Sequence, residues 1–451
     1  MIRFQRNPDG SLTLRTEVEV HVPAGTSMVE AEERLMSEVS KAGVGLTGEL
    51  LMSMDADGRA ISRRGRRMTA KRKKEVRHVE TPYGCAVVER WAYQDSRGGA
   101  CHYPMDAAAT LIGSATPKFA RMVSRKMVEL SAAEVVRDLK EHHARSVTVD
   151  FVQRLTELAG TLAAAAVPAP ACSGLPPRDA VASISIGVDG ACVLMGRRSE
   201  DAGTTDRRKE RVREWRVAMV GTVTLHDAAG ERLGTIYSAT APPEDKEDGK
   251  AAFWAVMGRE VAAIKERYPD AKCAGVSDGA SDFVPWLREH TQVQVLDFFH
   301  ASGYVCAAAG AFAHEVPAGE DPSTWWAQEA CSHLKHEEGA AADLLAVFEA
   351  RLADKRRICK ADREALERAA TYFRNNLDRM NYAQYAADGH PIGSGVTEAG
   401  CKLIIKKRFC GPGMTWSFRM AHHLMRLRAH AHSAGDRWND MWNAILTRKA
   451  A

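Results

Sequence analysis

The stretch Ile184-Ser185-Ile186-Gly187-Val188-Asp189-Gly190 is a short apolar run that ends in Asp-Gly. This pattern predicts a buried strand followed by a turn. A second run of the same kind, residues 273–279, ends in Asp278-Gly279. Asp-Gly is a common way to begin a turn, so one such pair alone indicates no chemistry. The order of the surrounding elements decides whether the two carboxylates can meet.

Strand and helix patterns alternate around these two runs. Strands are predicted at residues 215–226 and 232–240, with a hairpin turn between them. A long amphipathic helix, a short helix and a further strand follow at residues 248–268, 282–290 and 293–297. Three strands, a helix, a strand, a helix and a strand predict an α/β fold with a mixed sheet covered by helices, in the order of an RNase H-like core.

In this order the first and fourth strands lie side by side. We therefore expect Asp189 and Asp278 to be close enough to share divalent metal ions about 4 Å apart. Mg²⁺ prefers hard oxygen ligands, and Mn²⁺ is expected to substitute for it. Glu398, which follows the flexible turn Gly393-Ser394-Gly395, is the candidate third carboxylate. A Glu in the first turn of a helix is also favoured by the helix dipole, so a purely structural role for Glu398 stays open.

Two clusters of basic residues are far apart in the sequence. Between residues 59 and 77 there are ten Lys and Arg residues and one acid, Glu75. Such a run predicts either a solvated arm or an arm that binds nucleic-acid phosphates. The residues expected to contact DNA here are Arg63, Arg64, Arg66, Arg67, Lys71, Arg72, Lys73 and Lys74. The second cluster, expected near the DNA backbone, is Lys402, Lys406, Lys407 and Arg408.

Residues 131–160 predict two helices separated by a short polar break. Ser131 followed by Glu134 is a capping-box pattern, and Thr148 can cap the second helix. The pair has the shape of a helix–turn–helix, whose second helix would present Gln153 and Arg154 to a DNA groove. An ordinary helical hairpin has the same pattern, so the sequence leaves both interpretations open.

The composition of the 451 residues is that of a globular protein, with 45 % hydrophobic and 27 % charged residues. It excludes a wholly disordered or collagen-like chain. No apolar run approaches the ~20 residues of a membrane helix, and the N-terminal segment lacks the apolar core of a signal peptide. The ten cysteines are scattered without a Cys-x-x-Cys pair, which favours reduced thiols. We therefore expect a cytoplasmic protein with no membrane partner.

Together these segments resemble bacterial insertion-sequence transposases of the DDE type, most closely the ISKra group. The resemblance rests on Val188-Asp189-Gly190, Ser277-Asp278-Gly279-Ala280, Leu296-Asp297-Phe298-Phe299-His300 and, above all, residues 391–402, PIGSGVTEAGCK. It covers residues 181 to about 430 well and residues 96–160 more loosely. Some members of the group carry paired cysteines before the helical region. This chain does not, so no zinc site is expected there.

The resemblance implies two-metal-ion DNA cleavage and strand transfer, with Asp189, Asp278 and Glu398 as catalytic residues and Mg²⁺ ligands. Asp297 and His300 are similar to the Asp-x-x-His element of related transposases, for which we favour a supporting role over metal ligation. The implied partners are double-stranded DNA, as transposon ends and target, and further copies of the chain in a homodimer or higher oligomer on the bacterial nucleoid. Two alternatives remain: an RNase H-like nuclease without strand transfer, and a domesticated, non-catalytic DNA-binding regulator.

The predicted domain boundaries follow from the composition and the resemblance. An N-terminal region with the basic arm (1–80) precedes a helical DNA-binding domain with the helix–turn–helix (81–165). An Ala/Pro/Gly-rich linker (166–180) leads to the first part of the RNase H-like core (181–322). A helical insertion (323–387) then separates it from the C-terminal helical part of the core (388–451).

Overall fold

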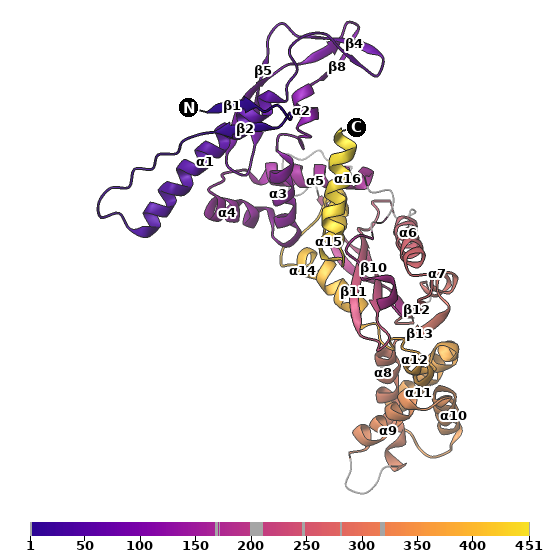
Figure 1. The fold of residues 1–451 in the computed structure, drawn as a ribbon. Helices are drawn as coiled ribbons and strands as arrows, with labels where there is room; N and C mark the ends of the chain where they lie inside the picture. Colours follow the sequence, from indigo (N-terminus) through magenta and orange to yellow (C-terminus); the bar gives the residue numbers. More distant parts are fainter. Residues whose placement is uncertain are drawn as a thin grey trace. The chain divides into compact units, whose positions relative to one another are not determined.

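The computed structural model describes residues 2–166, 170, 172–198, 211–245, 249–279, 282–315 and 321–450. The chain divides into two compact units, Met1–Pro168 with Asn439–Ala451, and Ala169–Trp438 (Figure 1). The division falls within the predicted linker, of which residues 167–169 and 171 lie outside the described residues. Ala280 of the quoted motif and residue 248, the first of the predicted long helix, also lie outside them.

A five-stranded mixed sheet forms the centre of the second unit, in the order β11-β10-β9-β12-β13. Strands β9 (Ser183–Arg198), β10 (Arg211–His226) and β11 (Arg232–Thr240) are antiparallel neighbours. Strand β12 (Lys272–Ser277) runs parallel to both β9 and β13 (Val293–Leu296). The predicted α/β class and mixed sheet are confirmed, and the first and fourth strands are neighbours as predicted.

Strand β9 is longer than the sequence pattern predicts. The apolar run was expected to end at Asp189, but β9 pairs with β10 without interruption as far as Arg198. Its pairing with the shorter β12 ends earlier, at the partners Gly187 and Val276. Asp189 therefore lies in the middle of a strand, just beyond the point where β12 stops covering its edge, and not in a turn.

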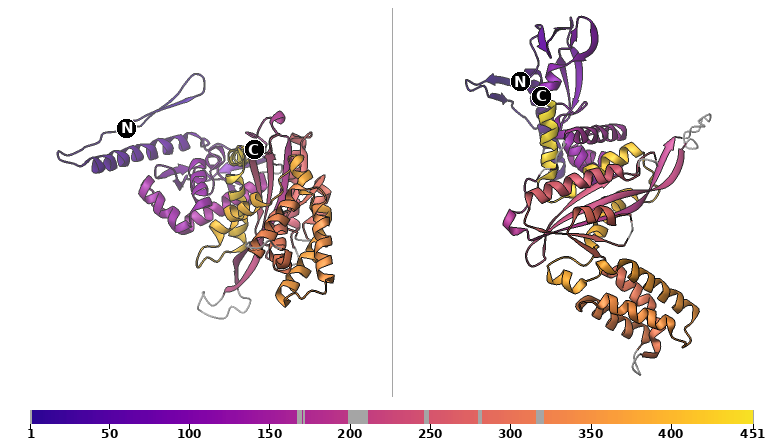
Figure 2. Two further views of the ribbon diagram at one scale, coloured as in Figure 1. Left: turned by 90° about the horizontal axis from the view of Figure 1, so that it is seen from below. Right: turned by 90° about the vertical axis from the view of Figure 1, so that its right-hand side faces the viewer.

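The two faces of the sheet have different coverings (Figure 2). Side chains alternate along β9, so Ile184, Ile186 and Val188 share one face. They belong to a buried cluster with residues of α6 (Ala251–Arg267) and α7 (Val284–His290). Gly187 and Asp189 belong to the opposite face, where α13 (Gly395–Gly400) packs: a Cβ atom at Gly187 would lie 1.9 Å from Thr397 Oγ1.

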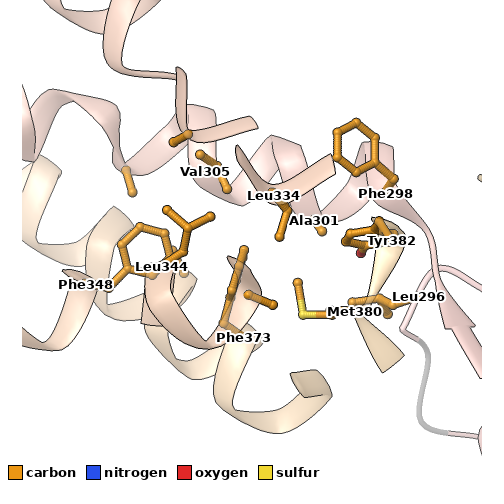
Figure 3. Packing of buried hydrophobic residues seen from close by; sticks show 14 of the residues in the cluster. Leu296, Phe298, Ala301, Val305, Leu334, Leu344, Phe348, Phe373, Met380 and Tyr382 are labelled. Carbon is orange, nitrogen blue, oxygen red and sulfur yellow. The ribbon is translucent and has the colours of Figure 1, made fainter. Parts of the chain in front are cut away.

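The described part of the segment between β13 and α13 is mainly helical. Its α-helices are α8 (Phe298–Ala308), α9 (Pro322–His336), α10 (Ala340–Ala353), α11 (Lys360–Asn376) and α12 (Tyr382–Ala387). Their apolar faces share one core with the sheet, in which Leu296 of β13 is buried with Phe348 and Phe373 of the helices (Figure 3). None of the helices in the described parts of the chain is both long and apolar enough to cross a membrane.

The C-terminal part of the chain is a series of helical segments after α13. They are the π-helical segment η4 (Cys401–Lys406), α14 (Lys407–Phe409), α15 (Phe418–His432) and α16 (Arg437–Ala450). The predicted core segment of residues 388–451 is divided, because Asn439–Ala451 groups with the first unit.

The first unit combines β-hairpins with helices. The 26-residue helix α1 (Met28–Ser53) follows the small hairpin of β1 (Arg3–Arg6) and β2 (Leu12–Arg15). The basic run, expected as a solvated or phosphate-binding arm, is ordered and forms strands β3 (Ile61–Arg63), β4 (Arg66–Ala70) and the start of β5 (Glu75–Glu80). Buried Met68 in β4 anchors it, and Arg64 and Gly65 make the tight turn between β3 and β4 with φ of 48° and 72°.

The predicted helical domain of residues 81–165 begins with strands. They are β6 (Cys85–Arg90), β7 (Tyr93–Asp95) and β8 (Gly98–His102), followed by the short helix α2 (Pro104–Ala108). Helices α3 (Pro117–Glu129), α4 (Ala132–His143) and α5 (Val149–Ala166) then pack together. The capping box of Ser131 and Glu134 is present at the start of α4, as predicted.

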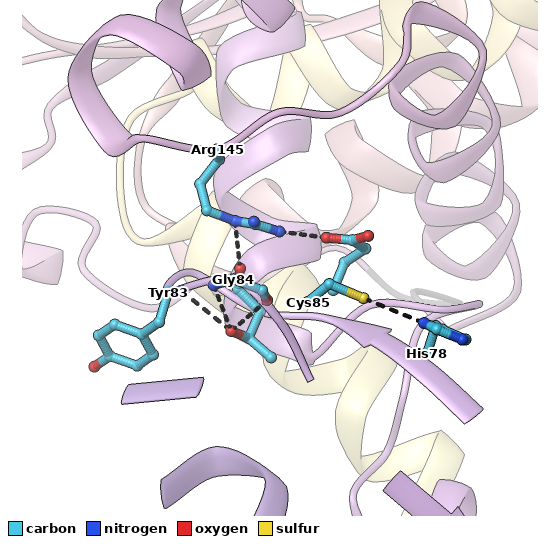
Figure 4. A network of polar contacts seen from close by, with 7 residues as sticks. His78, Tyr83, Gly84, Cys85 and Arg145 are labelled. Carbon is cyan, nitrogen blue, oxygen red and sulfur yellow. Dashed lines mark hydrogen bonds and ion pairs between the residues drawn. The ribbon is translucent and has the colours of Figure 1, made fainter. Parts of the chain in front are cut away.

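A buried arginine ties these helices to the β5–β6 hairpin (Figure 4). Arg145, which follows α4, donates from Nε to the Thr81 carbonyl at 3.0 Å and forms an ion pair with Glu80. The Thr81 hydroxyl in turn accepts from the Gly84 amide at 3.1 Å within the hairpin turn. The turn between the hairpin strands and the end of α4 are thus held in one polar network.

Candidate active site

A cavity of about 300 Å³ lies where β12 ends, and all three predicted catalytic carboxylates line it. Asp189 comes from the middle of β9, Asp278 directly follows β12, and Glu398 comes from α13. The rest of the wall is Val188, Gly190, His300, Ser394, Thr397, Lys402 and Lys406. Three segments that are far apart in the sequence therefore meet at one place.

Local backbone geometry fixes the positions of Asp189 and Asp278. Asp189 Oδ1 accepts a hydrogen bond from the Gly190 amide at 2.6 Å, which restrains its side chain. Asp278 is followed by Gly279 at φ of 95°, a conformation that glycine adopts without strain. The Tyr372 hydroxyl of α11 donates to the Asp278 carbonyl at 3.2 Å and holds this turn.

Helix α13 reaches the sheet through a threonine pair. The Thr397 hydroxyl lies 2.8 Å from the Thr222 hydroxyl of β10, and both are buried. The close approach is possible because Gly187 and Gly400 have no side chains at the contact. Glu398, next to Thr397, is thereby placed over the end of the β9–β12 pair.

Asp297 supports the loop before α13. It is 1 % exposed, caps α8 by accepting from the His300 amide at 2.9 Å, and accepts from both the amide and the hydroxyl of Ser394. Burial acts against the charged form of Asp297, but the hydrogen bonds from Ser394 and His300 outweigh it and lower the pKa of this carboxyl. The Ser394 hydroxyl also lies 3.5 Å from Glu398 Oε1. Asp297 thus orients the chain that carries Glu398.

Two lysines line the cavity together with the carboxylates. Lys402 and Lys406 are exposed, one and two turns beyond Glu398, and the π-helical segment η4 carries both. Cys401 is buried beside Asp189, and burial together with the Asp189 carboxylate raises the pKa of its thiol. The cavity therefore combines carboxylates with cations that suit a phosphodiester.

The donor set fits Mg²⁺ in chemistry, since Asp189, Asp278 and Glu398 offer hard oxygen ligands. Within the described residues, one group of three ligand atoms lies together within 4.8 Å, that of Asp297, His300 and Glu398. Asp297 is a poor ligand candidate, because Ser394 and His300 already engage both of its oxygens. Asp189 and Asp278 line the same cavity but belong to no such group of three in the described part of the chain.

The predicted DNA-contacting residues lie in both units. The eight Arg and Lys residues of β3–β5 and the segments between these strands are exposed, although Lys71 pairs with Glu75 and Lys74 with Asp55. Gln153 and Arg154 are exposed on α5, where Arg154 pairs with Asp150 at 2.9 Å. Lys407 is exposed. Arg408 is a wrong prediction: it is 4 % exposed and packs its guanidinium 4.8 Å from the centre of the Trp416 ring.

Comparison with known proteins gives no assignment. No protein-family model matches the chain, and no curated protein matches it. Sequence reasoning had already singled out the segment with Ser394 and Thr397, but not their positioning roles. It missed Thr222 and Tyr372 altogether, because nothing near either residue marks it as part of a site. The chemistry of the cavity is therefore the basis for assigning a function.

Proposed function

We propose that this protein is a DDE transposase with an RNase H-like core, which cleaves DNA and transfers the cut strand. The supporting observation is that Asp189, Asp278 and Glu398 line one cavity. One carboxylate lies on β9, a second directly follows the parallel strand β12 beside it, and a third lies on a helix packed over them. This arrangement is suited to binding metal ions and phosphate. Lys402 and Lys406, which line the same cavity, add the positive charge that a DNA backbone needs.

Asp189, Asp278 and Glu398 are the residues that would hold Mg²⁺ or Mn²⁺, which when bound lowers the pKa of the attacking hydroxyl and stabilises the leaving oxygen. The rest of the task is positioning. Asp297 and Ser394 hold the loop before α13, and Lys402 and Lys406 bind the phosphates that flank the cut. His300 lines the cavity, and its ring Nδ1 lies 3.5 Å from Asp297 Oδ1.

The first unit is proposed to bind the ends of the element. In this proposal α4 and α5 form a helix–turn–helix whose Gln153 and Arg154 face a groove, and the basic β3–β4 hairpin contacts phosphates. Joining two ends requires at least a homodimer on the DNA. The reaction would take place on the bacterial nucleoid in the cytoplasm.

The test uses labelled DNA that spans the boundaries of the gene's own genomic element. Wild-type protein, Asp278→Asn and the exposed control Asp270→Asn are compared in Mg²⁺, Mn²⁺ and Ca²⁺. We expect wild type and Asp270→Asn to cut with Mg²⁺ or Mn²⁺ but not with Ca²⁺, and Asp278→Asn to bind the ends without cutting.

Each other outcome selects another function. Cleavage without strand-transfer products on target DNA indicates an RNase H-like nuclease. Tight binding without cleavage in any metal indicates a DNA-binding regulator. Loss of DNA binding in Asp278→Asn indicates that Asp278 has a structural role, and the catalytic assignment then fails.

A further inference from the structure

A second and larger cavity lies on the far side of the Asp278 turn. Its volume is about 1040 Å³, at the upper end of the size range of small-molecule sites. Residues of α7, α8 and α11 line it, together with Gly279, which directly follows Asp278. None of the three proposed catalytic carboxylates lines it, so it is a separate space.

One wall of this cavity is aromatic. Tyr304 of α8 and Tyr372 of α11 both line it, and their rings stack with centres 4.0 Å apart and planes inclined by 16°. Neither ring is fully buried. A rigid, partly exposed pair of rings of this kind is a surface on which a nucleobase can stack, since every base has a flat π face.

The inner end of the cavity carries a buried cation. Arg379 is 4 % exposed and donates to the Ser277 hydroxyl at 3.2 Å and to the Asn376 side chain. No ion pair joins it to a carboxylate in the described part of the chain, although the charge of Asp378 acts on it from further away. A buried cation without a close counter-ion is costly, so an anionic group in the cavity would stabilise it.

The other charged groups of the lining place the anion. Glu364 and Glu367 line the cavity from the first half of α11, and Arg368 lies beside them. Arg288 of α7 pairs with Asp378 at 2.5 Å and stays half exposed. Glu364 pairs with Lys360 and Glu367 with Arg363, so the charges near the start of α11 are largely balanced. Arg379 is the buried cation of the lining, and its end of the cavity is the favourable place for an anion.

This cavity and the catalytic cavity share a wall. Tyr372 donates to the carbonyl of Asp278, and Arg379 donates to Ser277, the last residue of β12. A Cβ atom at Gly279 would lie 3.0 Å from the Tyr372 hydroxyl. A DNA strand bound at Asp278 would therefore pass close to the tyrosines.

We propose that this cavity binds one unpaired nucleotide of the DNA strand, with its base against Tyr304 and Tyr372 and its phosphate toward Arg379. The proposal rests on the function proposed above, since the strand is the one acted on at Asp278. A nucleotide accounts for both the aromatic wall and the uncompensated cation, whereas an apolar ligand or a simple anion accounts for one of them. Enzymes that do chemistry on a base take its nucleotide out of the stack into a pocket of this kind.

The test is a fluorescence titration of the full-length protein with a 5′-phosphorylated single-stranded trinucleotide that carries 2-aminopurine at its central position. Stacking on tyrosine is expected to quench the probe. Tyr304→Phe keeps the aromatic wall and should bind as wild type does, whereas Tyr304→Ala should bind at least tenfold more weakly. Thr371→Trp fills the cavity from an exposed position on α11 and should also abolish quenching, while Thr371→Ser should not.

Further controls separate the possible results. Tyr83→Ala removes an exposed tyrosine of the first unit and should leave the titration unchanged. An otherwise identical probe with an abasic central position should bind as weakly to wild type as the intact probe binds to Tyr304→Ala. Equal quenching by wild type, Tyr304→Ala and Thr371→Trp would overturn the nucleotide site even if Asp278-dependent DNA cleavage is found. Cavity-dependent quenching in a protein that cuts no DNA would instead support the site and overturn the transposase.

Discussion

Gly187 determines how closely the helix that carries Glu398 approaches the sheet. A Cβ atom at this position would lie 1.9 Å from Thr397 Oγ1, far inside the van der Waals distance. We expect Gly187→Ala to push α13 away from β9 and to lower the free energy of unfolding by about 1–3 kcal/mol. Because Glu398 moves with Thr397, Mg²⁺-dependent DNA cleavage should fall as well. Urea unfolding measures the first effect and a cleavage assay the second.

Gly303→Ala is the matched control for this substitution. Gly303 lies in α8, and a Cβ atom there would meet nothing within 4 Å. Alanine is the better helix former, so this variant should be as stable as wild type or more stable by up to about 1 kcal/mol. Equal stability of Gly187→Ala and wild type would show that α13 does not depend on the contact described here.

The β3–β4 hairpin concentrates positive charge at its tip. Arg63 lies directly opposite Arg66, and Arg64 occupies the turn between them. Like charges facing each other destabilise a hairpin, and a polyanion relieves the repulsion. If each arginine contacts one phosphate, the double variant Arg63→Gln/Arg66→Gln should reduce the slope of log K against log salt by about 1.8. Fluorescence anisotropy with a duplex of arbitrary sequence at several salt concentrations measures this slope.

The same change of charge elsewhere provides the control. Lys360→Gln/Arg363→Gln removes two exposed cations from α11, where each faces a glutamate four residues later. The slope should then be that of wild type. In the absence of DNA the hairpin variant should be no less stable than wild type, because it loses a repulsive contact. An unchanged slope in the hairpin variant would remove β3 and β4 from the DNA-binding surface.

At the scale of the whole molecule, the last helix belongs to both units. Arg437 at its start forms a buried ion pair with Glu260 at 2.9 Å in the second unit. Met441, Trp442 and Ile445 belong to the first unit and are each 1 % exposed. Trp442→Ala should therefore lower the stability of the first unit by about 3–5 kcal/mol. Hydrogen exchange should show lost protection in α3 and α5 but not in β9 and β12.

Trp215→Ala tests whether this effect comes from burial. Trp215 lies in β10 and is 65 % exposed, so its removal should change protection in neither unit. Loss of protection in β9 and β12 of Trp442→Ala would show that the two units unfold together. In that case the division at the linker would have no thermodynamic meaning.

Much of the second unit could be predicted because its signals are local. Apolar runs predict strands, and the order of strands and helices predicts which strands are neighbours, as the adjacent β9 and β12 confirm. The capping box at Ser131 is likewise a property of a few consecutive residues. Other features that depend on a distant partner were not predicted. Asp189 was expected at a strand end because the pairing of β9 with β10 beyond it cannot be seen in residues 184–190.

Arg408 and the basic run show the same limit on the scale of side chains. A cluster of cations predicts a solvated or DNA-binding surface. Arg408, however, is buried and packs against the Trp416 ring. In the basic run of residues 59–77, Met68 is buried and lies in a strand. Tyr372 gave no signal, since its neighbours in sequence are those of an ordinary amphipathic helix. Arg379 gave none either, since it lies in the short 3-10 turn Leu377–Arg379 that follows this helix.

The sequence by itself determined the α/β class, the order of the elements and the choice of Asp189, Asp278 and Glu398 as candidates. Only the tertiary structure decided that these three line one cavity, that Asp297 holds the loop before α13, and that a second cavity lies behind Asp278. The physical reason is the distance along the chain between the residues that interact. Strand alternation and helix capping depend on neighbours along the chain, whereas a cavity is the space left when segments far apart in the chain pack against each other.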